Sequence, residues 1–499
     1  MEGDSRAHGM CRMEWLCLAA AVVVSLVVHA GMMIDGLGEQ DAARLAVDAS
    51  LWHQGGSYVY FDGDYKPKVS PLYLHMLKSY LDCGGSVASL PAAMNWTNVV
   101  LASVLIVPAY LLWRLLAGAV AAVLATIIWS FAPVFWLSGL YGMPHLPSLM
   151  MLVLAGLAFA YHLRLAGWRR WALYACTAVA LTLSCMLKAD VILCSLGLVG
   201  IAIVMRRLTW GVMARWAALP LLAAGATVGY SGILAPSAPR AGEFLSQWQQ
   251  QYPFSVNAVM NSQVLVLVKV LGPVSFGAAI ASGLWLLWRR QERRLVMLAA
   301  MWSLPSILFW SLKDGNCARH MLSPYFMVPL MIGTAFVLLA KTLAARRGRG
   351  VAWLFGHPGA TMAVLSVALV VGNYFSIPPT RDLAQPSTRL VESRELLQDR
   401  LLYLASRGRQ FAQMSDERKV LVGASTNPYI LWEQLQVCSD FHWAGQSQVP
   451  VLELMTPFGA QQVRVVEVQQ PCTYCVPAGW RPWWMENGIE VKQEERSGR

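Results

Sequence analysis

Asp41 lies in a segment whose residue types and spacing suit acid–base chemistry at a membrane surface. Residues 38–56 begin with acidic side chains and end in Gly55-Gly56, a pair that terminates helices. The apolar positions at helical spacing are Leu45, Ala49 and Trp52. This pattern predicts a short amphipathic helix with Asp41 in its first turn. There the carboxylate either stabilises the positive helix end and pairs with Arg44, or acts as a general base.

Five further residues form a set of candidate cations. Lys66 and Lys68 follow in the same loop, Arg319 and His320 precede a late apolar run, and Lys269 interrupts another. Cations in such places can neutralise an anionic group such as a phosphate. The alternative is that the lysines extend to the interface and contact lipid headgroups.

Long apolar stretches determine the class of the protein. Of 499 residues, 56% are hydrophobic and 13% are charged. A helix needs about 20 mainly apolar residues to cross the hydrocarbon layer, and about eleven stretches qualify. They are residues 15–33, 96–113, 119–137, 146–163, 171–187, 191–205, 216–234, 263–288, 295–312, 321–340 and 361–377. The charged residues Lys188 and Asp190 divide the fifth from the sixth. We therefore predict an all-α polytopic membrane protein.

Basic residues concentrate in every second loop. They are Arg114; Arg164, Arg169 and Arg170; Arg206, Arg207 and Arg215; Arg289, Arg290, Arg293 and Arg294; and Lys341, Arg346, Arg347 and Arg349. The positive-inside rule makes these loops cytoplasmic, so an odd number of spans leaves the N-terminus cytoplasmic and the C-terminus extracytoplasmic. We expect the net charge of +11 to orient the chain in a bacterial plasma membrane rather than to bind nucleic acid. The first span lacks a convincing cleavage site, so we expect an uncleaved anchor.

Two segments are long enough to fold outside the membrane. The first is the outer loop 34–95, and the second is the tail 378–499. In the tail, 390–414 has helical spacing, whereas 419–423 and 462–468 are typical of strands. We therefore expect a membrane domain over 1–377, which includes the outer loop, and a small mixed α/β domain over 378–499 on the outer face.

Five of the ten cysteines lie on the predicted outer side, where disulfides can form. They are Cys83, Cys317, Cys438, Cys472 and Cys475. The spacing of Cys472 and Cys475 also fits a metal knuckle or redox pair, but no second such pair accompanies it. We favour a disulfide, with the pairing open. The acidic residues show no recognised ligand spacing, and we expect neither a metal nor a cofactor.

Aromatic residues mark several span ends. Trp96, Trp113, Trp136 and Trp288 are expected to anchor the helices at the membrane interface. His29, inside the first span, is expected to be a helix-packing histidine.

The order of the motifs resembles that of the GT-C superfamily of membrane glycosyltransferases. Residues 41–46 read D-x-x-R-x-A, residues 66–73 read K-P-K-x-x-P-L-Y, and residues 319–325 read R-H-M-L-S-P-Y. The closest likeness is to the branch of the protein O-mannosyltransferases and the lipid A aminoarabinose transferases. The resemblance extends to the topology and to the outer C-terminal tail, and so covers most of the chain.

Two positions depart from the family pattern. Many relatives have a second acidic residue in the second outer loop, where this chain has His145 and no carboxylate. Either His145 takes that place or the role is absent. The lysine motif is also irregular, so either Lys66 or Lys68 matches the lysine that relatives hold near the lipid phosphate.

The resemblance implies a reaction. A sugar would move, with inversion at its anomeric carbon, from a polyprenyl-phosphate donor to a lipid, glycan or protein acceptor on the extracytoplasmic face. Asp41 would take the proton of the acceptor hydroxyl or amine. The leaving polyprenyl phosphate is anionic, and the five candidate cations would stabilise its charge. The closest relatives are thought to need no divalent ion at this step.

Two other classes of protein remain open. A transporter or lipid flippase also needs many spans, but such proteins usually show charged midplane sites or related halves, and apart from Lys269 neither is evident. A non-catalytic membrane assembly protein would need only a packed body and an exposed tail. Loss of sugar transfer in a normally folded Asp41→Asn variant would separate an enzyme from both.

Overall fold

The structure is a computed structural model that describes residues 12–33, 70–86, 89–140, 142–234, 272–289, 292–311 and 318–345. It also describes short stretches between 42 and 53 and between 364 and 372, and the backbone of four strands between 420 and 467. The chain divides into two compact units. One comprises Met1–Met33, Thr97–Tyr230 and Ala241–Thr388, and the other Ile34–Trp96, Ser231–Arg240 and Arg389–Arg499.

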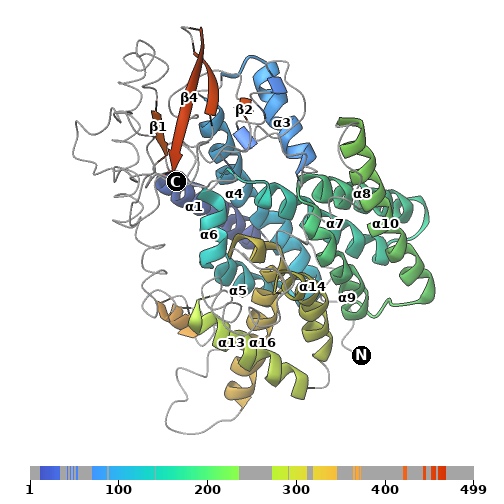
Figure 1. Ribbon diagram of the computed structural model, residues 1–499. Coiled ribbons are helices and arrows are strands. Elements are labelled where there is room, and N and C mark those ends of the chain that lie inside the picture. Colours follow the sequence, from blue (N-terminus) through green and yellow to red (C-terminus); the bar gives the residue numbers. More distant parts are fainter. Residues whose placement is uncertain are drawn as a thin grey trace, which may run out of the picture. The chain divides into compact units, whose positions relative to one another are not determined.

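The first unit is a bundle of helices, here called the helical body (Figure 1). Its helices are α1 (Arg12–Met32), α4 (Leu90–Ala117), α5 (Ala119–Ser130), α6 (Pro133–Leu140), α7 (His145–Arg164), α8 (Gly167–Leu187), η2 (Ala189–Leu196), α9 (Gly197–Val204), α10 (Trp210–Leu234), α13 (Pro273–Trp288), α14 (Arg293–Ser311), η3 (Ala318–Met321), α15 (Leu322–Tyr325) and α16 (Val328–Ala345). The first residues of α4 and the last of α10 belong to the second unit.

Most of the predicted spans coincide with these helices, with local differences. Residues 263–271 and most of the predicted span 361–377 lie outside the described residues. The division at Lys188 is confirmed, because α8 ends at Leu187 and η2 begins at Ala189. The predicted span 119–137 is interrupted, because Pro133 has no backbone N–H and begins a new helix, α6. Six helices in the described part of the chain are long and apolar enough to cross a membrane. The count of eleven therefore stays a prediction.

Small residues let neighbouring helices approach closely. A Cβ added at Gly200 on α9 would lie 2.8 Å from Leu298 Cα on α14. A Cβ at Gly333 on α16 would lie 2.8 Å from the carbonyl oxygen of Ala121 on α5. Close packing of this kind is the main source of helix association in a membrane, where lipid tails are as apolar as the helix surface.

Large aromatic side chains fill the centre of the helical body. Trp113 is fully buried and stacks on Phe326 with ring centroids 4.9 Å apart, so its prediction as an interfacial anchor is wrong. The cause is that α4 continues to Ala117, so Trp113 lies inside the packed helix rather than at its end. Trp96 and Trp288 are 44% and 80% exposed, which fits the predicted interfacial positions.

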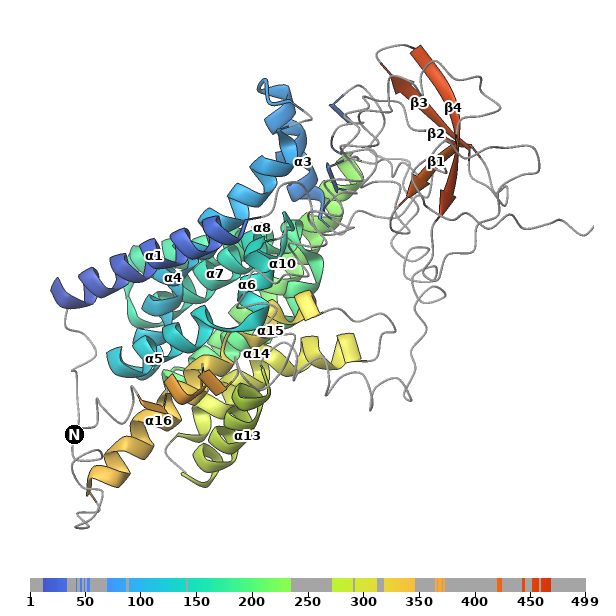
Figure 2. The same ribbon diagram turned by 90° about the vertical axis from the view of Figure 1, so that its left-hand side faces the viewer.

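His29 packs inside the helical body, as predicted. Its Nδ1 donates a hydrogen bond to the carbonyl oxygen of Ser25 at 2.7 Å, and its ring meets Phe135 edge-on. At the other end of α1, Glu14 accepts hydrogen bonds from Tyr110 and Arg114 of α4. Figure 2 shows α1 together with the other helices of the body. These contacts attach α1 to the body at both ends.

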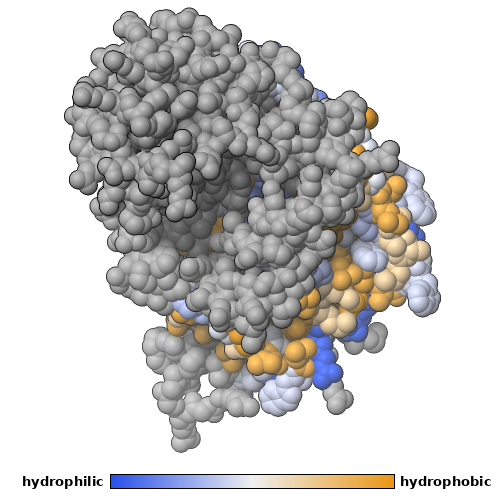
Figure 3. Space-filling model, viewed as in Figure 1, coloured by the Kyte–Doolittle hydropathy of each residue, from blue (hydrophilic) through white to orange (hydrophobic). Residues whose placement is uncertain are grey.

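The outward-facing side chains of the helices are largely apolar. Figure 3 shows hydrophobic residues over much of the described surface. Exposed examples on α8 and α10 are Val179, Leu221, Leu222, Val228 and Ile233. A largely apolar exterior around a packed interior is the pattern expected of helices that face lipid.

In the second unit, the described residues between 42 and 53 are helical. The most deeply buried of them are Ala42, Ala46 and Ala49, so the small side chains occupy the inner face rather than Leu45 and Trp52. Helix α3 (Pro71–Asp82) follows, with Pro71 in its first turn. Proline is favoured there because the first N–H groups of a helix have no intrahelical partner.

The tail contains a four-stranded sheet. Its strands are β1 (Val420–Gly423), β2 (His442–Ala444), β3 (Val451–Thr456) and β4 (Gly459–Glu467), in the order β1-β4-β3-β2. β1 pairs with β4 in parallel, and the other neighbours are antiparallel. β1 and β4 match the two predicted strands. The helix predicted at 390–414 lies outside the described residues, and the α/β domain as a whole stays a prediction.

Candidate functional site

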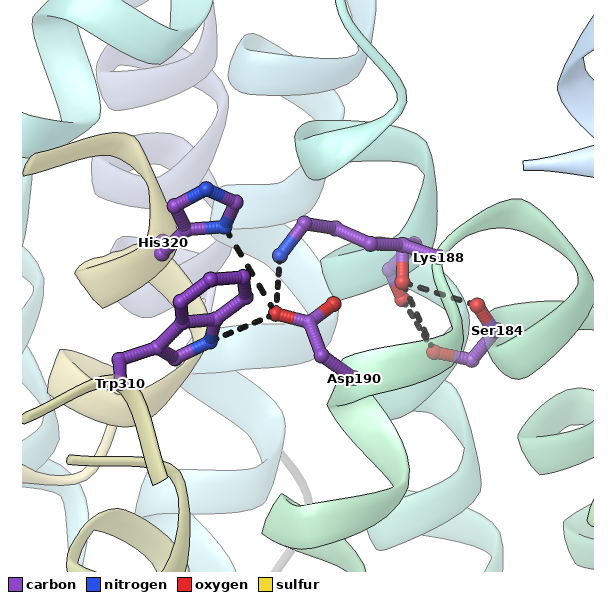
Figure 4. A network of polar contacts seen from close by, with 6 residues as sticks. Ser184, Lys188, Asp190, Trp310 and His320 are labelled. Atoms are coloured by element: carbon purple, nitrogen blue, oxygen red, sulfur yellow. Dashed lines mark hydrogen bonds and ion pairs between the residues drawn. The ribbon is translucent and has the colours of Figure 1, made fainter. Parts of the chain in front are cut away.

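Asp190 is the centre of a charged cluster in the helical body. One carboxylate oxygen, Oδ2, accepts a hydrogen bond from Lys188 Nζ at 2.5 Å and from Trp310 Nε1 at 2.9 Å. The same oxygen lies 3.8 Å from His320 Nδ1. Figure 4 shows the side chains of Lys188, Trp310 and His320 converging on this carboxylate. We call Lys188, Asp190, Trp310 and His320 the Asp190 cluster.

Local backbone geometry positions Lys188 and Asp190. Helix α8 ends at Leu187, Lys188 is extended, and the 3-10 helix η2 starts with Asp190 in its first turn. A carboxylate is favourable there because the free N–H groups of a helix start carry partial positive charge. Ser184 and Ser148 exchange side-chain to backbone hydrogen bonds of 2.7 and 3.0 Å, which hold α8 against α7 just before this break.

Hydrogen bonds to α14 position His320. Trp302 Nε1 donates to the carbonyl oxygen of Ser323 at 2.8 Å, and the Ser303 hydroxyl donates to that of Pro324 at 2.6 Å. Both donors lie on α14, and both acceptors lie on α15, directly after His320. Because the donors are buried in the body, η3 and α15 are fixed relative to Trp310, which lies near the end of the same helix α14.

Ring contacts lie within the cluster and connect it to His145. Trp310 and His320 stack with centroids 3.7 Å apart and an interplanar angle of 20°. The ring of His145 lies with its centroid 5.5 Å from that of His320. His145 is buried at the start of α7. The site thus joins three predicted outer loops, those that precede α7, follow α8 and follow α14.

Asn98 fixes the segment before His145. Its Nδ2 donates to the carbonyl oxygen of Met143 at 3.0 Å and to that of Ser138 at 3.3 Å. Asn98 is fully buried on α4, so these bonds replace water for the carbonyl of Met143 and for that of Ser138 near the end of α6.

The electrostatics of the cluster favour an ionised Asp190, which lies between the candidate spans. Burial raises its pKa, but the charges and hydrogen bonds of Lys188 and His320 outweigh that effect and hold the pKa far below its usual range. A carboxylate with so low a pKa is a weak base. Asp190 therefore suits the positioning of cations better than proton abstraction.

The cluster provides donors for an anion. Lys188 is 9% exposed and His320 15%, so both are nearly dehydrated yet reachable. An ammonium has three N–H donors, and among the described residues Lys188 donates only to Asp190. In the same part of the chain, no group of three His, Cys, Asp or Glu side chains is arranged to hold a metal ion.

The predicted site residues fall into two groups. His145 and His320 are brought together by the structure. Asp41, Lys66, Lys68 and Lys269 lie outside the described residues, as does the side chain of Arg319. Of the outer cysteines, Cys83 is free and exposed, and the other four lie outside the described residues.

Sequence reasoning missed Lys188, Asp190 and Trp310 as site residues. The signal for the first two was present, because they form the charged break between two apolar runs. Charged residues inside a membrane protein are costly and usually functional. Trp310 carries no comparable signal, because it is one of 21 tryptophans in the chain.

Comparisons with known proteins identify the fold. No protein-family model and no curated protein sequence matches the chain. Among solved structures, ArnT from Cupriavidus metallidurans bound to undecaprenyl phosphate is similar with a TM-score of 0.57 and 14% identity, over 85% of each chain. Its apo state gives the same TM-score with 16% identity, over 84% of each chain.

A second enzyme shows the same likeness. The archaeal oligosaccharyltransferase AglB from Archaeoglobus fulgidus, in complex with an inhibitory peptide and a dolichol-phosphate, has a TM-score of 0.53 and 13% identity. The match covers 85% of this chain and 64% of that one. ArnT and AglB both belong to the GT-C superfamily. The chain therefore has the fold that these two GT-C proteins share.

Proposed function

We propose that the protein is an integral membrane glycosyltransferase that moves a sugar from a polyprenyl-phosphate donor to an acceptor on the extracytoplasmic face of the bacterial plasma membrane. The N-terminus is cytoplasmic, and the tail 378–499 forms an α/β domain outside. Asp41 is the general base, and transfer inverts the anomeric carbon.

The fold supports the donor class. The similar ArnT structure holds undecaprenyl phosphate, and the similar AglB structure holds a dolichol-phosphate. Both molecules are phosphates of long isoprenoid alcohols. A helical body of the same fold, with an apolar exterior, suits a donor whose tail stays in the bilayer while its phosphate lies at the interface.

The Asp190 cluster is the observation that carries the proposal. In an apolar body, Lys188 and His320 come together from helices far apart in the sequence and share one carboxylate. Transfer leaves an anionic polyprenyl phosphate, and preorganised cations stabilise the charge that develops there. We assign Lys188 and His320 to this phosphate, together with Lys66 or Lys68, Arg319 and Lys269. Asp190 holds the first two in place.

Asp41 performs the proton transfer in this proposal. Its neighbour in the sequence, Ala42, is fully buried. Asp41 would accept the proton of the acceptor hydroxyl or amine as the sugar is transferred.

The Asp41→Asn variant tests the enzyme assignment. Purified protein in proteoliposomes is supplied with lipid-linked sugars and an acceptor fraction from bacterial envelopes, and release of free polyprenyl phosphate is measured. We expect release to fall at least about 100-fold, the lower range for loss of a general base. Asp48→Asn, in the same loop, is the control and should retain activity. Equal activity of wild type and Asp41→Asn would exclude Asp41 as the base.

The donor class has its own test. Lipids that co-purify with the wild-type protein are extracted and identified by mass spectrometry. A polyprenyl phosphate is expected among them, and it should be depleted in a Lys188→Gln variant. A transporter of another solute would carry no such lipid.

A further inference from the structure

Two arginines lie beside each other at the end of the helical body away from the Asp190 cluster. Arg170 is in the first turn of α8, and Arg215 is on α10. The Tyr174 hydroxyl of α8 donates to the carbonyl oxygen of Arg215 at 2.8 Å, which holds the two helices together here. The Arg215 guanidinium lies 5.8 Å from the ring centroid of Trp171, the residue after Arg170.

Both guanidinium groups lack a negative partner among the described residues. The Nε atoms of Arg170 and Arg215 are buried and have no hydrogen-bond partner there. Their charges act on each other and on the nearby His162. His162 is also buried and donates Nδ1 to the carbonyl oxygen of Arg170 at 2.8 Å. Like charges that act on each other repel, and an anion bound between them would offset this repulsion.

Three other arginines in the described part of this body have hydrogen-bonding or ionic partners. Arg114 forms an ion pair with Glu14 at 3.1 Å, and Arg164 donates to the Leu115 carbonyl oxygen at 3.3 Å. Arg289 donates to the Thr342 hydroxyl at 3.0 Å. Arg170 and Arg215 differ from these three because their Nε atoms are buried and have no such partner among the described residues.

Helix geometry adds to the positive charge at this place. The first turn of α8 contains no acidic residue, although carboxylates are usually favoured there. The unpaired N–H groups of a helix start attract anions, so Arg170 and the helix end act together. Several tryptophans are strongly exposed at the same ends of α8 and α10. They are Trp168, Trp171 and Trp210, which are 76%, 56% and 90% exposed.

The exposed tryptophans indicate the level of the bilayer. Tryptophan rings gather where the hydrocarbon meets the lipid headgroups. Helix α7 runs from His145 to Arg164, about 30 Å at 1.5 Å per residue, so this end lies roughly one hydrocarbon thickness from the Asp190 cluster. The arginine pair thus lies at headgroup level on the predicted cytoplasmic side, where anionic lipids are the abundant phosphates.

We propose that Arg170 and Arg215 form a binding site for the phosphate of an anionic phospholipid, with Trp171 packing against the lipid. The site is separate from the proposed transferase site and does not depend on the function assigned to it. Occupation would offset part of the charge of the pair and fasten α8 to α10, so bound lipid should stabilise the whole body.

Native mass spectrometry of the full-length protein tests the site with phosphatidylglycerol as the probe and phosphatidylcholine as the neutral reference. Wild type should retain phosphatidylglycerol selectively, and R170Q/R215Q should bind it at least about 30-fold more weakly, because hydrogen bonds between charged groups are strong. The control R206Q/R207Q removes the same charge from two exposed arginines of the neighbouring loop. It should change binding less than about three-fold, because exposed charges are screened.

Two results would overturn the proposal. One is equal retention by wild type and R170Q/R215Q, and the other is an equal loss in the control, which would indicate a diffuse basic surface. If R170Q/R215Q does not fold, R215K with its retained charge replaces it and should bind with intermediate affinity. Thermal unfolding with inorganic phosphate in place of lipid should show no stabilisation. Stabilisation equal to that by phosphatidylglycerol would contradict a lipid site.

Discussion

The indole of Trp310 lies flat against the imidazole of His320, with ring centroids 3.7 Å apart, while its Nε1 donates to Asp190. One side chain therefore makes two attachments. It fixes the plane of His320 through ring contact, and it fixes the carboxylate that holds Lys188. Because Trp310 comes from α14, Lys188 and Asp190 from the break after α8, and His320 from η3, the geometry of the cluster depends on the packing of these elements.

Substitution of Trp310 should separate its two roles. Trp310→Phe keeps a ring over His320 and loses the hydrogen bond, which is worth about 1.5–3 kcal/mol to a charged acceptor. Trp310→Leu also loses the aromatic contact, worth about 0.5–1.5 kcal/mol. We expect affinity for undecaprenyl phosphate, measured by native mass spectrometry, to fall in the order wild type, Phe, Leu. The control is Leu308→Ala, on the exposed face of the same helix.

The low pKa of Asp190 predicts how the stability of the protein depends on pH. A group whose folded pKa is lowered contributes stability that is fully present above its unfolded pKa, about 3.9, and is lost as pH falls below it. We compare the thermal stability of the His320→Gln protein with that of the His320→Gln, Asp190→Asn protein, so that His320 does not titrate. The difference should be constant from about pH 8 to 5 and shrink only below about pH 4. A difference that shrinks between pH 7 and 5 would contradict an ionised, lysine-paired Asp190.

The sequence predicts the helices of this protein better than the contacts within its candidate site. Helix positions follow from apolar runs, and the break at Lys188 and Asp190 is visible as charge in such a run. The partner of that break is not visible, because Trp310 lies 120 residues from Asp190 and no local pattern joins them. The predicted topology reduces the number of possible partners for Asp190, because Asp190 and Trp310 both lie at helix ends predicted to face outward. Which of these residues contacts Asp190 depends on how the helices pack.

The sequence-based prediction for Trp113 differs from the structure for a physical reason, and that for His145 is incomplete. Trp113 was assigned to the interface because it ends an apolar run, yet α4 continues past it and the ring is buried. His145 was a candidate only because it replaces an expected carboxylate. The structure gives it a definite neighbour, His320, and an anchor on its segment, Asn98.

Asn98 should matter for the stability of the segment that carries His145. Asn98→Ala removes the donor for the Met143 and Ser138 carbonyl oxygens. Leaving buried acceptors unsatisfied costs roughly 1–3 kcal/mol. The control is Ser103→Ala, also buried on α4, whose hydroxyl donates only within its own helix, to the Val99 carbonyl oxygen. The unfolding temperature in detergent should fall clearly for Asn98→Ala and little for the control. An equal effect would indicate that the loop contact is unimportant.

The close approach of α9 and α14 should also be needed for the Asp190 cluster, since α9 continues from η2 and α14 carries Trp310. Gly200→Val places a side chain against the Leu298 backbone, 2.8 Å from the new Cβ, and overpacking of this kind costs about 1–3 kcal/mol. Gly225→Val on α10 is the control, because nothing lies within 4 Å of its Cβ position. We expect Gly200→Val to lower both the unfolding temperature and the affinity for undecaprenyl phosphate, and Gly225→Val to change neither. If Gly200→Val lowers only the unfolding temperature, the helix contact supports the body but does not position the cluster.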